Sequence, residues 1–296
     1  MVGEHNLTYK IAQGLIYVIL ALLALATLLP FIHLISVSLS SMGAVDAGLV
    51  GIWPVRPHLD NYVFVFQDKQ VFRALSISVV RLLLGVGLNL FVITLTAYPL
   101  SLDRVHMPGR TAFKLVMLFG MLFSAGLIPY FLSMRNLGLL DNFMVLILPP
   151  ALNIFYTIVM INFFRGILSE LADAAFVDGA SHFDVLCRIY VPISLPSLAT
   201  ITVFSAVQHW NAWFDGILFL RQASMWPLQS LAYQKVTMRQ VEWISKVGFQ
   251  TTDFFQITPQ GLSAAFVMFA AVPIMLVYPF LQRYFLTGLT LGSVKG

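Results

Sequence analysis

The polar stretch SELADAAFVDGASHFDVLCRIYVPISLP, residues 169–196, stands between two long apolar runs and decides how the chain is organised. A compact polar insert between runs long enough to cross a membrane lies in water at the membrane surface. Its alanines leave little side-chain bulk, so another surface can approach the backbone closely. Gly179 suits the end of a short helix. We therefore predict a docking segment on a membrane protein that is driven from outside.

Composition supports a membrane protein. Hydrophobic residues make up 59% of the 296 residues and charged residues only 10%, whereas a soluble domain carries roughly 25% charged residues. The formal charge of +4 is small and the basic residues are scattered, so we expect no nucleic-acid partner. The single Cys187 excludes an internal disulfide and a metal site built from cysteines.

The apolar runs predict six membrane-spanning helices, because each is close to the roughly 20 residues that a spanning helix needs. The expected spans are residues 11–39, 74–100, 112–134, 140–164, 197–220 and 261–285. The ten-residue alternation of a membrane barrel is absent from the sequence. The fold class is therefore an all-α polytopic membrane protein, with residues 1–296 as a single transmembrane domain.

Six spans place both termini and residues 166–196 on one side of the membrane. Lys and Arg residues outside the spans divide evenly between the two sides. The compact 103–110 loop favours cytoplasmic termini, because short loops near helix ends weigh most. We take the side of the termini as cytoplasmic.

Two hydrophilic segments, residues 40–73 and 221–260, then face outward. The second mixes aromatic and polar residues, including Trp226, Tyr233 and Trp243. Such a mixture suits folding against a partner or a ligand. The alternative is a loop that only links two helices.

Within the polar stretch, residues 169–177 favour a short helix. Glu170 and Asp173 lie near its start, where the helix dipole favours anions. Ser181, followed three residues later by Asp184, resembles a capping box that starts a second short helix. An ordinary helical loop would show the same local features.

The spacing of this stretch resembles a known signature. Asp-Ala-Ala, three residues, Gly, nine residues, Ile, one residue and Val-Pro, from Asp173 to Pro192, is similar to the loop of ATP-binding-cassette (ABC) importer permeases. That family has Glu-Ala-Ala at the start and Leu-Pro at the end. The resemblance implies that the segment is a cytoplasmic coupling helix that docks into an ATPase subunit. The docking residues would be Glu170, Asp173, Ala174, Ala175, Asp178, Gly179, Ala180, Ile189 and Pro192.

Two further features resemble the carbohydrate-uptake group that includes the maltose permeases. They are the tail GLTLGSVKG, residues 288–296, and the pair Trp210-Asn211. The outward sequence Trp226-Pro227-Leu228-Gln229 is similar to a subgroup for oligosaccharides and polysaccharides, including alginate and pectin fragments.

These resemblances imply a type I ABC importer permease fold in the cell inner membrane. Such a permease works with a second permease, two ATPase subunits and an extracytoplasmic solute-binding protein, to move an oligosaccharide by alternating access. This chain has no Gly-x4-Gly-Lys-Ser/Thr phosphate loop. We therefore expect a non-catalytic subunit that binds no cofactor itself, with ATP and Mg²⁺ held by the ATPase partners.

Polar residues inside the expected spans are candidates for the substrate path, because burying them in lipid is costly. They gather in residues 208–215, which offer the aromatic rings and amide or carboxylate groups that hold sugars. The alternative is that each bonds to a neighbouring helix. The candidates are Asn89, Asn153, Gln208, Trp210, Asn211, Trp213, Asp215 and Arg81.

Arg81 is the only basic residue well inside an expected span. It would pair with an acid such as Asp215, extend to the membrane surface, or meet an acidic sugar in the path.

Two rival classes remain. A secondary transporter that works without an ATPase would usually show internal repeats or broken helices around a midplane site, and the sequence shows no repeat. A membrane-embedded enzyme would need a motif such as His-Glu-x-x-His or Gly-x-Ser-x-Gly, and the sequence contains neither.

Overall fold

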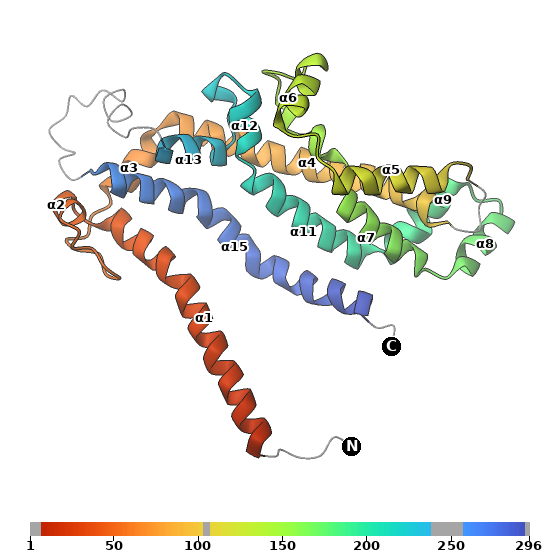
Figure 1. Ribbon diagram of the computed structural model, residues 1–296, viewed down its shortest axis with the longest axis horizontal. Helices are drawn as coiled ribbons and strands as arrows, with labels where there is room; N and C mark the ends of the chain where they lie inside the picture. The colour runs from red at the N-terminus through yellow and green to blue at the C-terminus, as the bar shows by residue number, and fades with distance from the viewer. Residues whose placement is uncertain (1–6, 103–106, 238–256, 294–296) are drawn as a thin grey trace. The chain divides into compact units, whose positions relative to one another are not determined.

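The computed structural model describes residues 7–102, 107–237 and 257–293, and the regular structure within these ranges is helical (Figure 1). The three longest helices are α1 (Leu7–Leu39), α4 (Lys69–Ser101) and α15 (Pro259–Ser293). Each contains a stretch long and apolar enough to cross a membrane. They contain the predicted spans 11–39, 74–100 and 261–285.

The other three predicted spans are interrupted. Residues 112–134 divide at Phe123, which is extended, and at Gly126, whose φ is +85°. Residues 140–164 begin with two short 3-10 turns, which meet the following helix at 43°. Residues 197–220 break at Ala212. The elements are α5 (Arg110–Leu122), α6 (Leu127–Asn136), η1 (Phe143–Leu146), η2 (Pro149–Ala151), α7 (Ile154–Arg165), α11 (Leu195–Asn211) and α12 (Phe214–Phe219).

The polar insert folds into short helices. The helix expected over residues 169–177 is α8 (Ser169–Val177), with the same bounds. It is followed by α9 (His182–Val185), the π-helical turn η3 (Leu186–Tyr190) and α10 (Val191–Ile193). The chain then bends by 80° into α11. Among the described residues, three helices qualify as spans by length and composition, or five if each bent pair is one span.

The segments predicted to face outward contain short helices and loops: α2 (Met42–Asp46), α3 (Asp60–Gln67), η4 (Ala223–Met225) and α13 (Leu228–Thr237). The predicted outward segment 221–260 is described only at its two ends. Its residues 238–256, including Trp243, lie outside the described residues, as do residues 103–106 of the predicted inner loop and 294–296 of the tail.

The chain divides into two compact units. The first consists of Met1–Lys69 and Gln234–Ala271. In this unit, polar side chains hold residues 52–61 against the end of α1: Ser36 Oγ donates to the Ile52 carbonyl (2.5 Å), and Asn61 Nδ2 donates to the Ser38 carbonyl (2.9 Å). Apolar side chains farther back along α1, from residue 9 to residue 29, are exposed, which suits a helix that faces lipid or another apolar helix.

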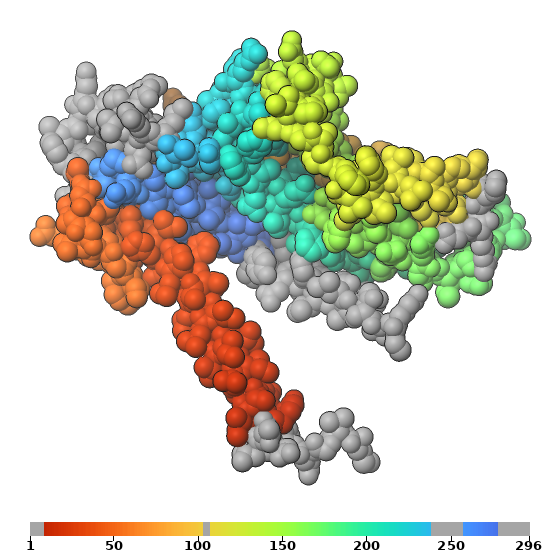
Figure 2. Space-filling model, in the orientation of Figure 1, coloured from red at the N-terminus to blue at the C-terminus, as the bar shows by residue number. Residues whose placement is uncertain are grey.

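The second unit consists of Gln70–Tyr233 and Val272–Gly296. Its main core joins α4, α7, α8, η3 and α11 through fully buried side chains such as Ile93, Met160 and Phe164. Figure 2 shows α6 and α12 protruding side by side from this unit, and Phe131 stacks on Phe219 between them at 6.0 Å. The second unit therefore contains both the polar insert and the break at Ala212 in the fifth predicted span.

Helices α4 and α11 approach closely at Gly85. A Cβ at this position would lie 2.5 Å from the His209 ring, whereas a Cβ at Gly87, on another side of α4, would have no heavy atom within 4 Å. Small residues at helix contacts let backbones approach in membranes. Gly85 therefore makes the space that buries His209.

We predict that Gly85→Ala destabilises the protein by about 1–3 kcal/mol, the usual cost of overpacking. The matched variant Gly87→Ala removes a glycine from the same helix without a clash, so it should gain up to about 1 kcal/mol. Thermal unfolding of the purified protein in detergent, followed by gel filtration, measures both. Equal unfolding midpoints for the two variants would contradict the close contact.

Candidate functional site

The predicted docking residues lie on α8 and on the turns that follow it, up to α10. Glu170, Asp173 and Ala174 are exposed on the helix, and Asp178 and Gly179 are exposed just after it. Ala175, Ala180 and Ile189 are half-buried, and Pro192 is exposed. The nine residues lie within one continuous segment, so they are available together to a partner.

Gly179 ends α8 as the sequence predicts. Its φ is +87°, a conformation that residues with a Cβ adopt reluctantly. Its N–H donates to the Phe176 carbonyl (3.1 Å), and the Ala180 N–H donates to the Ala175 carbonyl (2.9 Å). This pair of bonds is a Schellman motif, which turns the chain sharply after the exposed face.

The predicted capping box is also confirmed. Ser181 Oγ accepts a hydrogen bond from the Asp184 N–H, and Asp184 Oδ2 accepts one from the Ser181 N–H, both at 3.2 Å. Asp184 lies outside the predicted spans, and hydrogen bonds from the Ser181 side chain and backbone lower its pKa. The carboxylate therefore stays ionised at the start of α9, where the helix dipole favours an anion.

A hollow of about 440 Å³ lies beside this turn. Five predicted docking residues line it, together with Asp184, Val185 and Arg188. The five are Ala175, Asp178, Gly179, Ala180 and Ile189. A ridge or side chain of a partner protein therefore has a concave surface to enter.

The opposite face of α8 packs into the second unit through an aromatic cluster that the sequence did not reveal. Tyr98 at the end of α4 bonds to His182 (3.1 Å) and meets Tyr190 edge to face at 5.1 Å. The Phe176 ring of α8 meets the His182 ring edge to face, with centroids 4.8 Å apart. The Phe164 ring of α7 meets the Tyr190 ring in the same way, with centroids 5.3 Å apart. Ala172 is only 3% exposed. Helix α8 is therefore fixed to α4 and α7.

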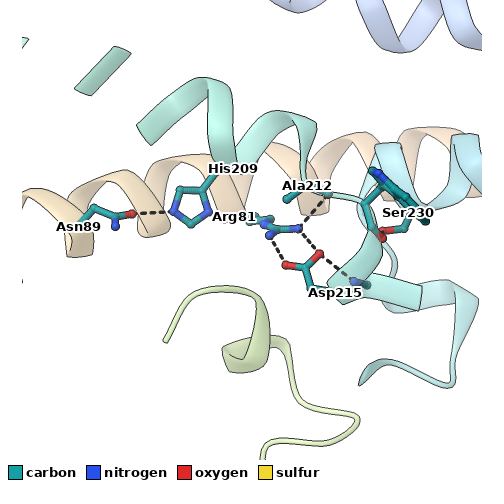
Figure 3. Close-up of polar contacts among 8 residues, drawn as sticks. Arg81, Asn89, His209, Ala212, Asp215 and Ser230 are labelled. Carbon is teal, nitrogen blue, oxygen red and sulfur yellow. Dashed lines mark hydrogen bonds and ion pairs between the residues drawn. The ribbon is translucent and has the colours of Figure 1, made fainter. Parts of the chain in front are cut away.

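Within the predicted spans, Arg81 and Asp215 form an ion pair (Figure 3). The Arg81 side chain is buried, and its Nη1 also donates to the Ala212 carbonyl at 3.2 Å. Pairing with Asp215 was one of the alternatives for Arg81, and it is confirmed. Removing one partner of such a pair would leave an uncompensated buried charge, so the two residues hold the break between α11 and α12 against α4.

Asn89 is the centre of a second set of polar contacts. Its Nδ2 donates to the Pro150 and Ala151 carbonyls at 2.7 and 3.0 Å. Its Oδ1 accepts from Ser205 (3.0 Å) and pairs with His209 Nε2 (2.7 Å), the latter contact visible in Figure 3. One amide of α4 thus holds the interrupted fourth span and α11.

The other predicted path residues are more open. Asn153 Nδ2 donates to Gln208 Oε1 at 3.3 Å, and Gln208 and Asn211 are exposed. Trp213 is 37% exposed, whereas Trp210 is buried. The predicted path residues therefore separate into a buried network and an exposed group. The exposed group is Gln208, Asn211 and Trp213, and the half-buried Asn153 bonds to Gln208.

The exposed group ends at a turn that α13 supports. Ser230 Oγ of α13 donates to the Trp213 carbonyl at 2.7 Å. The Trp213 ring stacks on Tyr233, with ring centroids 4.1 Å apart. Tyr233 was noted at the sequence level as part of the aromatic and polar mixture of residues 221–260, but its contact with Trp213 and the role of Ser230 were not predicted, because nothing local links them to residue 213.

The described residues offer no obvious metal centre: within residues 7–102, 107–237 and 257–293, no three His, Cys, Asp or Glu side chains gather to hold an ion.

No family model matches the sequence. The chain is 38% identical over 292 residues to the polygalacturonan/rhamnogalacturonan transport system permease protein YtcP of Bacillus subtilis (strain 168), which covers 97% of this chain and 99% of that protein. It is 37% identical over 273 residues to protein LplC of the same organism, covering 91% and 90%. A solved bacterial ABC transporter chain, involved in the import of the acidic polysaccharide alginate, superposes with a TM-score of 0.84 at 32% identity, covering 96% of this chain and 100% of that one.

Proposed function

The chain belongs to the permease subunits of carbohydrate ABC importers, and from this premise we propose that it forms, with a second permease, the path for an acidic oligosaccharide. As a permease subunit it is a non-catalytic membrane component, and its family works with separate ATPase subunits. A transporter that works without an ATPase is not favoured, because the relatives are ABC permeases.

The substrate class rests on two relatives. One is named for polygalacturonan and rhamnogalacturonan, and the solved structure is of an importer for alginate, an acidic polysaccharide. Polygalacturonan and alginate share uronate units, so we propose a fragment rich in uronates. Arg81 is buried and paired with Asp215. We therefore assign it to shaping the 212–215 turn beside the path, not to touching the sugar.

The docking of α8 into an ATPase subunit is carried by one observation: α8 is exposed on its Ala174 face and buried on its Ala172 face. The exposed face offers the motif and the hollow beside it. The buried face packs on the core of the second unit. A displacement of α8 by a closing ATPase dimer is therefore passed to α4, α7 and α11.

ATP biases this motion only through a difference in its affinity for the inward- and outward-facing states. ATP and Mg²⁺ bind to the ATPase subunits in this scheme, and α8 transmits the difference. The exposed residues Gln208, Asn211 and Trp213 contact the sugar as the path opens outward.

The corresponding topology has six crossings of the inner membrane, with lipid around them and both termini in the cytoplasm. Residues 166–196 face the two ATPase subunits. Residues 40–73 and 221–260 face outward, toward a solute-binding protein that delivers the oligosaccharide. Counting each bent pair as one span gives five candidate spans among the described residues, and the interrupted segment 112–134 would supply the sixth, since broken helices are tolerated where protein or a polar cavity surrounds them.

The substrate class is tested by ATP hydrolysis of the purified complex, with its two permeases, its ATPases and its binding protein in lipid nanodiscs. We expect oligogalacturonate or oligoalginate to raise ATP turnover, and neutral malto-oligosaccharides of the same length to leave it at the basal rate. Equal stimulation by the neutral sugar would contradict an acidic substrate.

The docking surface is tested by placing a charged side chain at Gly179. We expect Gly179→Asp to insert and assemble but to abolish uptake, since it puts a carboxylate into the docking turn. Gly138→Asp is the matched control. Gly138 also has a positive φ, +68°, and open space around it, but it lies on the outward side in this topology. Both changes carry similar backbone strain, so full uptake by both variants would exclude docking at α8.

A further inference from the structure

We propose that Trp213 and Tyr233 form an aromatic platform on which a pyranose ring of the oligosaccharide stacks at the outer end of the path. This inference rests on the proposed function, and it adds Tyr233 of the 221–260 segment to the residues of the substrate path. The aromatic platform is defined as these two rings together.

The two rings lie almost parallel, with centroids 4.1 Å apart and an interplanar angle of 18°. Trp213 remains 37% exposed and Tyr233 43% exposed. Each ring therefore uses one face for the other ring and retains open surface. The C–H groups on one face of a pyranose are apolar and pack well on such a surface, while the polar tips of Trp and Tyr stay available for hydrogen bonds.

Trp213 is more exposed and less hydrogen-bonded than Trp226, another tryptophan of the second unit. Trp226 is 9% exposed, and its indole N–H donates to the Leu220 carbonyl at 2.8 Å. Within the described part of the chain, neither the Trp213 indole N–H nor the Tyr233 hydroxyl has a hydrogen-bond partner. Buried tryptophan and tyrosine usually find such a partner. The two free polar tips are therefore suited to hydroxyl or carboxylate oxygens of a sugar.

The backbone that carries Trp213 is held from two sides. Ser230 Oγ donates to the Trp213 carbonyl at 2.7 Å, and Arg81 Nη1 donates to the Ala212 carbonyl at 3.2 Å. Gly216 also packs closely against Ser230, because a Cβ added at Gly216 would lie 2.2 Å from Ser230 Oγ. A site fixed before the ligand arrives loses less entropy on binding. The turn thus presents Trp213 in one orientation.

Amides lie along the chain next to the platform. Asn211 is two residues before Trp213, and Gln208 is about one turn of α11 farther back, and both are exposed. Carbohydrate sites combine an apolar ring face with a few placed polar groups. The side chains of Gln208, Asn211 and Trp213 therefore follow one another along one segment. This order fits an extended saccharide that stacks on the platform and hydrogen-bonds to the two amides as it enters the path.

The test uses tryptophan emission of the complete complex in nanodiscs, held outward-facing with a non-hydrolysable ATP analogue and titrated with alginate pentasaccharide. Trp213→Phe keeps an aromatic face but removes the indole, so the wild-type spectrum minus the variant spectrum isolates Trp213. We expect this difference to change with saccharide. Trp213→Ala and Tyr233→Ala should weaken saccharide binding about tenfold, and Trp213→Phe should weaken it less than either.

Trp226→Phe is the control, because it removes a buried indole from the same unit and should leave the saccharide-dependent change intact. A saccharide-dependent change of the same size in wild type and in Trp213→Phe, which leaves the difference spectrum constant, would overturn the platform. So would equal affinity in wild type, Trp213→Ala and Tyr233→Ala. If a neutral pentasaccharide gives the Trp213 signal and the acidic one does not, the platform stands and the acidic substrate fails.

Discussion

The hydrogen bonds of Asn89 are the interaction on which the second unit depends. This amide of α4 donates to two carbonyls of the Pro149–Ala151 turn and accepts from Ser205 and His209 of α11. A backbone interrupted at membrane depth has carbonyls that no water can satisfy, and each would cost several kcal/mol in hydrocarbon. Asn89 satisfies two of them from a neighbouring helix. The fourth predicted span can therefore be irregular without exposing its backbone to lipid.

The same unit links its two ends mechanically. At the polar insert, the Tyr98–His182–Tyr190 aromatic cluster fixes α8 and η3 to the end of α4. Farther along α4, Asn89 and Arg81 hold α11 and the 212–215 turn. Helix α4 therefore contacts the docking segment at one end and the turn that carries Trp213 near the other. In the proposed mechanism, α4 carries a displacement of α8 to this turn.

Local features were predictable from the sequence, and long-range contacts were not. The bounds of α8, the left-handed Gly179 and the capping box at Ser181 follow from residues close in sequence, and all three are confirmed. The partnership of Arg81 with Asp215 was one of three alternatives, and it follows from the cost of a lone charge in lipid. The contacts of Asn89 with His209 and of Tyr98 with His182 join residues 120 and 84 positions apart, and no local pattern announces them.

The breaks in the predicted spans show a second limit. Hydrophobicity measures whether a segment prefers lipid, and it is insensitive to an interruption of a few apolar residues. Residues 123–126 keep the composition of a span while the helix stops. The pair Pro149-Pro150 was the visible signal for the second break, since each proline lacks a backbone donor. Pairing across α6 and α12, or between Trp213 and Tyr233, is set by tertiary packing.

The most direct measurement is saccharide uptake into vesicles that contain the two permease subunits, with and without the ATPase subunits, when loaded binding protein is supplied outside. We expect uptake only when the ATPases and ATP are present on the side of α8, because the permease has no energy source of its own. Accumulation of the saccharide by the permeases alone, driven by an ion gradient, would contradict the assignment of this chain as a gate moved by its partners.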